Sequence, residues 1–374
     1  MDIADVLEPW VQIVREQVPD LELFDAHTHL GEHDPDGRRQ SPDELLAMLR
    51  MADANGCFVF PMHELDGYPP ANDMVIAAAA QADGLFVPFC RVNPHDHAVP
   101  EAERALAAGA QGIKLHPRAE EFTLDHPAVH SLFALAHERS LPILIHAGRG
   151  IPALGVHVAG YAKEYPGARV ILAHAGVSDL AWIWRAAAEL PNLLFDTAWW
   201  IGPDLRALFT LVPPGQIVFA SDAPYGHTAV GAALQFRVAL QAGLSAQQIR
   251  LIASGQSRRI ATGEPLEPAG PAVGERDAAS HVLLDRVAEL LQLSTMLWMR
   301  GTDGDEMLSL ARLACEVPDE IDDAPVFAAI RSLLDAFDTA TIEDPDDRRR
   351  LTLLMMASAV ARTPDVPVPA SRNS

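Results

Sequence analysis

The stretch LPILIHAGRGIPALGVHVAGYAKEYPGARVILAHAG (141–176) contains one full unit of the pattern that decides the fold. Two short apolar runs, 141–148 and 168–176, are rich in Ile, Leu and Val and flank a longer segment with many alanines and glycines. Short β-branched runs are typical of buried parallel strands, and the longer intervening segment is typical of a helix. The stretch therefore predicts a strand–helix–strand unit with a histidine at the end of each strand.

The same rhythm extends over residues 21–223. Eight apolar runs are found, at 21–27, 56–63, 85–93, 112–117, 141–148, 168–176, 192–200 and 216–224. Their starting points are spaced by about 28 residues, close to the roughly 30 residues of a βαβ unit. Eight such units predict a closed (β/α)₈ barrel. The alternative, an open doubly wound sheet, would need a glycine-rich phosphate loop after an early strand, and the sequence has none there.

The pattern changes after residue 263. The predicted organisation is a catalytic barrel (1–263), a Pro- and Gly-rich linker (264–277), a small all-α domain (278–362) and a disordered tail (363–374). The all-α domain is predicted from four amphipathic segments, at 281–299, 305–317, 324–340 and 344–361. Their apolar faces need a partner, which could be the same domain, the barrel or a second subunit in a homo-oligomer.

Composition excludes several classes of protein. The 374 residues carry 28 Lys and Arg against 51 Asp and Glu, a net charge of −23, which argues against nucleic acid or an anionic membrane as a partner. No stretch approaches about 18 uncharged apolar residues, and the N-terminus is not a signal peptide. Cys57, Cys90 and Cys315 lie in apolar runs and cannot all pair, so we expect reduced core cysteines and a cytoplasmic protein.

Polar residues stand where the predicted strands end. They are His27, His29, His146, His174 and Asp222. In a barrel the C-terminal ends of all strands meet at one mouth, where active sites lie, so these side chains should converge. Imidazoles and a carboxylate around one point suit a divalent metal such as Zn²⁺. The alternative is a set of hydrogen-bonded core histidines, but a buried cluster of this kind would be expensive to desolvate without a metal.

Four motifs resemble the amidohydrolase superfamily, and within it the amidohydrolase-related branch that also contains non-oxidative decarboxylases. They are DAHTHLG (25–31), ILIHAG (143–148), ILAHAG (171–176) and ASDAPYG (220–226). The resemblance covers about residues 21–262. In the helix that closes it, Gln256 stands where asparagine would be expected, and we expect this departure to loosen a local cap.

The resemblance implies roles for these residues. His27, His29, His146 and Asp222 would hold the metal, with one Zn²⁺ favoured and Mn²⁺ or a second metal as alternatives. Asp222 would also act as the general base for a metal-bound water. His174 would bind a second metal or polarise an oxygen of the substrate.

The fourth run, GIKLHP, bears on the number of metals. Lys114 is expected inside the barrel as an unmodified cation near Asp222 or Asp196. A carboxylated lysine that bridges two metals, and a side chain outside the barrel, are the alternatives. His116 would be a substrate donor or a further ligand, or would simply end the strand.

Other residues near the predicted mouth are candidates for binding the substrate. Arg91 and Arg149 could hold a substrate carboxylate through forked hydrogen bonds, or could instead pair with nearby acids such as Glu120, Glu121 or Asp96. Trp199 would form part of an apolar wall. The partner is thus expected to be a small molecule that bears a carboxylate.

The predicted function is that of a metal-dependent hydrolase, in which metal-bound hydroxide attacks an amide, ester or lactone of a small organic substrate. The alternative is a metal-dependent decarboxylase of an aromatic or unsaturated acid, which would use the same ligands. A further alternative is a scaffold that binds metal without catalysis. The sequence has no G-x-S-x-G nucleophile elbow, which disfavours covalent hydrolysis.

Overall fold

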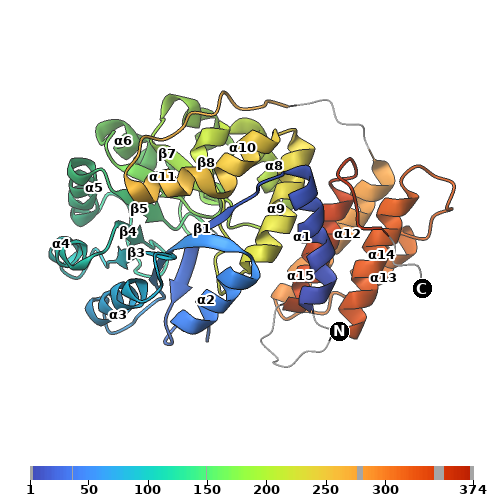
Figure 1. Cartoon of the computed structure of the whole chain (residues 1–374), viewed down its shortest axis with the longest axis horizontal. Helices are drawn as coiled ribbons and strands as arrows, with labels where there is room; N and C mark the ends of the chain where they lie inside the picture. Colours follow the sequence, from blue (N-terminus) through green and yellow to red (C-terminus); the bar gives the residue numbers. More distant parts are fainter. Residues whose placement is uncertain (1–2, 36, 149, 276–280, 341–348, 371–374) are drawn as a thin grey trace.

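The computed structural model describes residues 3–35, 37–148, 150–275, 281–340 and 349–370. Eight parallel strands form one sheet in the order β1 to β8, and helices surround it (Figure 1). The strands are β1 (Leu23–Leu30), β2 (Ala54–Pro61), β3 (Phe86–Arg91), β4 (Gly112–Leu115), β5 (Pro142–Ile145), β6 (Arg169–Leu172), β7 (Leu193–Asp196) and β8 (Ile217–Val218). Each strand falls at one of the eight predicted runs, and the predicted (β/α)₈ barrel is confirmed.

The barrel closes between its first and last strands. The ladder of β8 ends at Val218, and the chain beyond it pairs with β1 through single contacts. Ala26 N donates to the Phe219 carbonyl at 2.8 Å, and His29 N donates to the Ala223 carbonyl at 2.8 Å. This seam therefore places the segment that contains Asp222 against the strand that carries His27 and His29.

The outer helices follow the strands in sequence. They are α2 (Pro42–Met51), α3 (Pro69–Ala80), α4 (Ala98–Ala108), α5 (Pro127–Arg139), α6 (Gly155–Glu164), α7 (Leu180–Ala186), α8 (Gly202–Leu211) and α9 (Thr228–Ala242). A capping box starts α2, in which Ser41 Oγ accepts from Glu44 N and Glu44 Oε2 accepts from Ser41 N.

The barrel ends with α10 (Ala246–Arg250), a π-helical turn (Leu251–Gly255) and α11 (Gln256–Thr262). The expectation that Gln256 loosens a cap is wrong. Its side chain is completely buried, and its amide donates to the carbonyls of Gly215 and Glu267 while its oxygen accepts from Glu267 N at 3.0 Å. The longer glutamine side chain therefore ties the turn before β8 to the segment after α11.

The four predicted C-terminal helices are present as α12 (Val282–Met299), α13 (Asp305–Ala314), α14 (Ala324–Thr339) and α15 (Arg349–Ala361). They pack on one another, and α15 packs on α9 of the barrel. The N-terminal helix α1 (Ile3–Gln17) lies between the two parts and contacts α9, α14 and α15 (Figure 1). Buried side chains of the barrel and of these helices form one continuous hydrophobic cluster, so the helices use the barrel as a partner.

The segment after α15 differs from the expected disordered tail. Thr363 and Val366 are buried, and Arg237 of α9 donates hydrogen bonds to three carbonyls between residues 363 and 367. The expectation of disorder fails for residues 363–370 because composition does not reveal that Arg237, far away in the sequence, binds this segment. Residues 371–374 lie outside the described part of the chain.

Two predictions from composition can be compared with the structure. The three cysteines are buried and unpaired, as expected for reduced core residues. None of the helices in the described ranges has the length and apolarity that a membrane span requires.

Candidate metal centre

His27 and His29 lie two residues apart on β1, so both rings point into the barrel. Their Nε2 atoms are 3.2 Å apart, and each lies 3.1 Å from Oδ1 of Asp222 across the seam. Metal bonds of about 2.1 Å place neighbouring ligand atoms roughly 3.0–3.4 Å apart in octahedral or tetrahedral sites. The three donors thus already have the spacing of ligands around one ion.

Asp196 at the end of β7 orients His27. Its Oδ2 lies 2.7 Å from Nδ1 of His27, and its Oδ1 accepts from the backbone N–H groups of His174 and Ala198. A proton on Nδ1 leaves the lone pair of Nε2 facing Asp222, which is the arrangement that a metal ligand needs. The sequence analysis names Asp196 only as a possible neighbour of Lys114, and the signal for its role here is its place at the end of a strand.

His174 follows β6 and belongs to the same group. One ligand atom each from His27, His174 and Asp222 lies within 4.8 Å of the others. Nδ1 of His174 is 2.9 Å from the Ala198 carbonyl, which can only accept, so Nδ1 carries the proton and Nε2 is the acceptor nitrogen of the ring.

His146 follows β5 and stands beside His174. Its Nδ1 lies 3.0 Å from Nε2 of His174, and its own Nε2 is buried with no hydrogen-bond partner in the described part of the protein. A buried ring nitrogen of this kind is costly unless a ligand occupies it. The structure thus brings His146 to the site, although His174 is closer to the group formed with His27 and Asp222.

Burial sets the charge of these imidazoles. It lowers the pKa of His27, His29 and His146 well below the usual range, and the charge of Lys114 adds to this effect for His27 and His29. The rings are therefore neutral, which is the form that binds metals. Neutral nitrogen donors and one carboxylate form a set that fits a divalent cation.

Lys114 lies on β4 and is completely buried inside the barrel, so the alternative with its side chain outside is wrong. Its Nζ is 3.3 Å from Nε2 of His27 and 4.5 Å from the centre of the Phe60 ring. Burial and the charge of Arg91 lower the pKa of Lys114 to about 7, whereas Asp222 and Asp196 oppose this shift. Lys114 places an amine directly beside the metal donors.

Two other predicted residues line the edge of the site. The His116 ring stacks on the His146 ring with centres 3.8 Å apart, and its Nδ1 accepts from Ala119 N, so the proton lies on Nε2. Trp199 lies with its ring centre 6.2 Å from that of His174, and its Nε1 donates to Asp204. Both side chains are half-buried, as expected for a pocket wall.

Arg91 pairs with Glu120, which is the structural one of the two roles predicted for it. Its Nη2 and Nε donate to Oε1 of Glu120 at 2.7 and 3.1 Å, and the hydroxyl of Tyr68 donates to the same oxygen. The guanidinium is completely buried and its fork is already used. Because Glu120 is 29 residues from Arg91, the sequence alone does not favour this ion pair over contact with a substrate. Arg149 lies outside the described residues.

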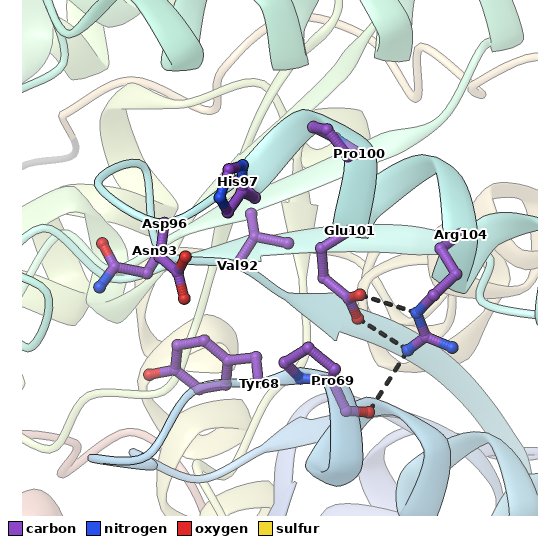
Figure 2. A pocket seen from close by; sticks show the side chains of 9 residues that line it. All are labelled: Tyr68, Pro69, Val92, Asn93, Asp96, His97, Pro100, Glu101 and Arg104. Carbon is purple, nitrogen blue, oxygen red and sulfur yellow. Dashed lines mark hydrogen bonds and ion pairs between the residues drawn. The ribbon is translucent and has the colours of Figure 1, made fainter.

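A cavity of about 250 Å³ is lined by Tyr68, which bonds to Glu120 of this ion pair, and by residues that follow β3. Figure 2 shows its lining. Tyr68 and Asn93 stand on one side of it, and on the other Glu101 pairs with Arg104, which also donates to the Pro69 carbonyl. Its lining contains none of the strand-end histidines and not Asp222. The cavity is thus separate from the predicted metal centre.

Comparisons with known proteins bear on the family and the fold of the chain. A family model described as "Amidohydrolase" matches residues 24–260, which is more than half of the chain. A 6-methylsalicylic acid decarboxylase from Penicillium expansum is 34% identical over 94 residues, which are 20% of this chain and 29% of that protein. The chain therefore matches less than a third of the length of this curated relative.

Solved structures resemble the barrel at low identity. A 5-carboxyvanillate decarboxylase from Sphingomonas paucimobilis is 16% identical, with a TM-score of 0.51 over 65% of this chain and 99% of that chain. A 2,6-dihydroxybenzoate decarboxylase, solved with 2,6-dihydroxybenzoate, is 14% identical, with a TM-score of 0.51 over 65% and 98%. At these identities the structures establish a shared fold.

Proposed function

The chain belongs to the amidohydrolase family, and from this premise we propose that it is a metal-dependent decarboxylase of a small aromatic or unsaturated acid. The metal would be held by His27, His29 and Asp222, with His146 or His174 completing the set. Zn²⁺ suits these nitrogen and oxygen donors, and Mn²⁺ is the alternative. The observation that carries the proposal is the buried amine of Lys114 beside the donors.

Lys114 supports a substrate that bears a carboxylate. Among the described residues, no carboxylate lies in ion-pair contact with its Nζ, and the amine is enclosed by His27 and the Phe60 ring. A buried ammonium without a direct counter-ion is costly, and an anionic substrate would supply the missing charge. A carboxylate held between Lys114 and the metal would meet this need.

Asp222 is the group that we assign to proton transfer. In decarboxylation the bond between the carbon and the carboxylate breaks, CO₂ leaves, and a proton takes its place on the carbon. Burial raises the pKa of Asp222, so this carboxyl takes up a proton more readily than an exposed one, which suits a group that transfers a proton. A bound divalent metal would add positive charge beside the substrate oxygens.

Similarity in sequence supports decarboxylation over hydrolysis. The curated relative acts, by its name, on 6-methylsalicylic acid, an aromatic acid of the kind proposed here. The sequence alone had favoured hydrolysis of an amide, ester or lactone, and that reaction is the second candidate. It is favoured by the position of Asp222 Oδ1, which as a carboxylate could accept a proton from water at the metal.

The third alternative, a scaffold without activity, has less support. The chain has each strand-end residue that the family resemblance requires, and Nε2 of His146 is buried without a hydrogen-bond partner in the described part of the protein. A scaffold would have no need for such a costly buried set.

Isotope labelling distinguishes the two reactions. The metal-loaded protein is incubated with a panel of hydroxybenzoates, lactones and amides in D₂O and, separately, in H₂¹⁸O. We expect CO₂ release and a single deuterium on the product carbon, with no ¹⁸O in the organic product. Incorporation of ¹⁸O without release of CO₂ would refute decarboxylation and leave the metal centre in place.

A further inference from the structure

We infer that Asp25 is a positioning residue of the metal centre, whose buried carboxylate holds Asp222 in place against the strand that carries His27 and His29. This inference rests on the proposed metal site and deepens it. Asp25 lies on β1 two residues before His27, and its carboxylate bonds to Ser221 and Thr228.

Asp222 lies beyond the regular ladder of β8, in a segment that only single backbone bonds join to β1. The β8 ladder ends at Val218, four residues earlier, and Asp222 has a φ of +63°, in the left-handed region that residues other than glycine rarely adopt. Such a conformation persists only where the surroundings enforce it. The 3.1 Å separations of Asp222 from His27 and His29 thus depend on contacts outside the ladder.

The carboxylate of Asp25 supplies these contacts. Its Oδ1 accepts from Ser221 N at 2.9 Å and from His27 N at 3.2 Å. Its Oδ2 accepts from Ser221 Oγ at 2.6 Å and from Thr228 Oγ1 at 2.8 Å. Ser221 Oγ in turn accepts from Ala223 N at 3.2 Å. Both chain neighbours of Asp222 are therefore connected to one carboxylate on β1.

A second brace acts from the other side. Thr197 Oγ1 accepts from Ala220 N at 3.0 Å, and Gln235 Nε2 of α9 donates to the Ala220 carbonyl at 2.9 Å. This brace holds the segment to β7 and α9, whereas Asp25 joins it to the strand that carries the two histidines. Asp25 thus adds side-chain bonds to the two backbone bonds, from Ala26 N and His29 N, that join the Asp222 segment to the histidine strand.

The chemistry of the Asp25 contacts predicts different effects of two substitutions. In Asp25→Asn the amide oxygen can still accept from Ser221 N and His27 N, and the amide nitrogen can donate to the hydroxyls of Ser221 and Thr228, which can rotate to accept. Asp25→Ala removes all four bonds. If Asp25 positions Asp222, the Asp25→Asn variant should therefore keep the Zn²⁺ affinity that Asp25→Ala loses.

The test measures metal affinity in the full-length protein. Metal-free samples are titrated with Zn²⁺ in competition with a chromophoric chelator, and thermal unfolding is measured on the same samples. Gln216→Ala is the matched control, because Gln216 is also buried and donates to the carbonyls of Ala187, Leu190 and Leu193, before β8 begins. It should lower the melting temperature without weakening Zn²⁺ binding.

We expect Asp25→Ala to weaken Zn²⁺ binding by about 10- to 100-fold, as is usual for residues that orient metal ligands, and Asp25→Asn to remain within about threefold of the natural protein. If Asp25→Ala does not fold, Ser221→Ala removes only the two hydrogen bonds of the Ser221 hydroxyl, to Asp25 and from Ala223 N, and should weaken binding in the same direction. Unchanged affinity in the folded variants, or an equal loss in Gln216→Ala, would overturn the inference. A natural protein that binds no Zn²⁺ would instead refute the metal centre and the inference together.

Discussion

Removing the last twelve residues should destabilise the protein through one buried arginine. Arg237 of α9 is completely buried, and its Nη1 and Nη2 donate to the carbonyls of Thr363, Val366 and Pro367 at 2.6–3.2 Å. Its guanidinium also lies 5.2 Å from the centre of the Trp10 ring. In the described ranges it forms no ion pair with a carboxylate, so these carbonyls are the main groups that stabilise its charge.

The size of the effect follows from these contacts. Burial lowers the pKa of Arg237 to about 9, which reflects how costly its charge is in this place. Hydrogen bonds to a charged group contribute about 1.5–3 kcal/mol each, and leaving a buried charge without its partners costs about 3–5 kcal/mol. Deletion of residues 363–374 should therefore lower the free energy of unfolding by about 3–5 kcal/mol.

A double-mutant cycle isolates the arginine. Arg237→Met keeps an apolar chain on α9 but needs no acceptors, so in this background the deletion should cost only the contacts of Val366 and its neighbours, about 1–2 kcal/mol. The coupling between the two changes should be about 2–3 kcal/mol. Gln241→Ala is the control, because Gln241 also bonds to the segment, through Asp365, but at an exposed position.

Urea unfolding followed by tryptophan fluorescence and circular dichroism provides the measurement. Coincident transitions from the two probes justify comparing free energies. If the deletion costs the same with arginine and with methionine at position 237, the carbonyls do not stabilise the buried charge and the reasoning fails. Gln241→Ala should change stability by less than about 0.5 kcal/mol.

Three further predictions concern the metal site. Asp222→Asn keeps the side-chain size but cannot transfer a proton, so turnover should fall about 10²–10⁴-fold, with Zn²⁺ still detected by elemental analysis. Zn²⁺ should raise the melting temperature of the metal-free protein, and His27→Ala should abolish this rise. At a Zn²⁺ concentration a hundred times the dissociation constant, the gain in the free energy of unfolding should be about 2.7 kcal/mol. Lys114→Met should raise KM for carboxylate substrates at least about tenfold, and an unchanged KM would show that Lys114 does not contact the substrate carboxylate.

The barrel could be predicted because its signal is local and repeated. Each apolar run identifies its own strand, and barrel geometry then brings residues such as His27 and Asp222 together although they are far apart in sequence. The limits of the prediction have the same origin. The run at 216–224 predicts a full strand, but β8 covers only Ile217–Val218, and the rest is held by single backbone bonds to β1 and by side chains from other elements.

Residues whose role depends on a distant partner could not be identified in advance. The position of Arg91 at a strand end is compatible with binding a substrate carboxylate or pairing with an acid such as Glu120, and only the fold shows that Glu120 occupies its fork. Gln256 looked like a weakened cap, but its length lets it reach two other segments. In each case the sequence shows a polar side chain at an informative position, but only the fold determines which group that side chain contacts.

Helix α9 connects the two parts of the molecule that the sequence appeared to separate. Thr228 at its start bonds to Asp25, Gln235 in its middle bonds to Ala220, and Arg237 binds the C-terminal segment. The same helix thus supports Asp222 and receives residues 363–367, so strain at one end can be transmitted to the other. If α9 is rigid, deleting residues 363–374 should lower stability and leave Zn²⁺ affinity within about threefold; if the helix shifts, affinity should fall as it does in Asp25→Ala. Titrating the deletion variant with Zn²⁺ below its unfolding transition would decide between a purely structural C-terminal segment and one that contributes to the metal centre.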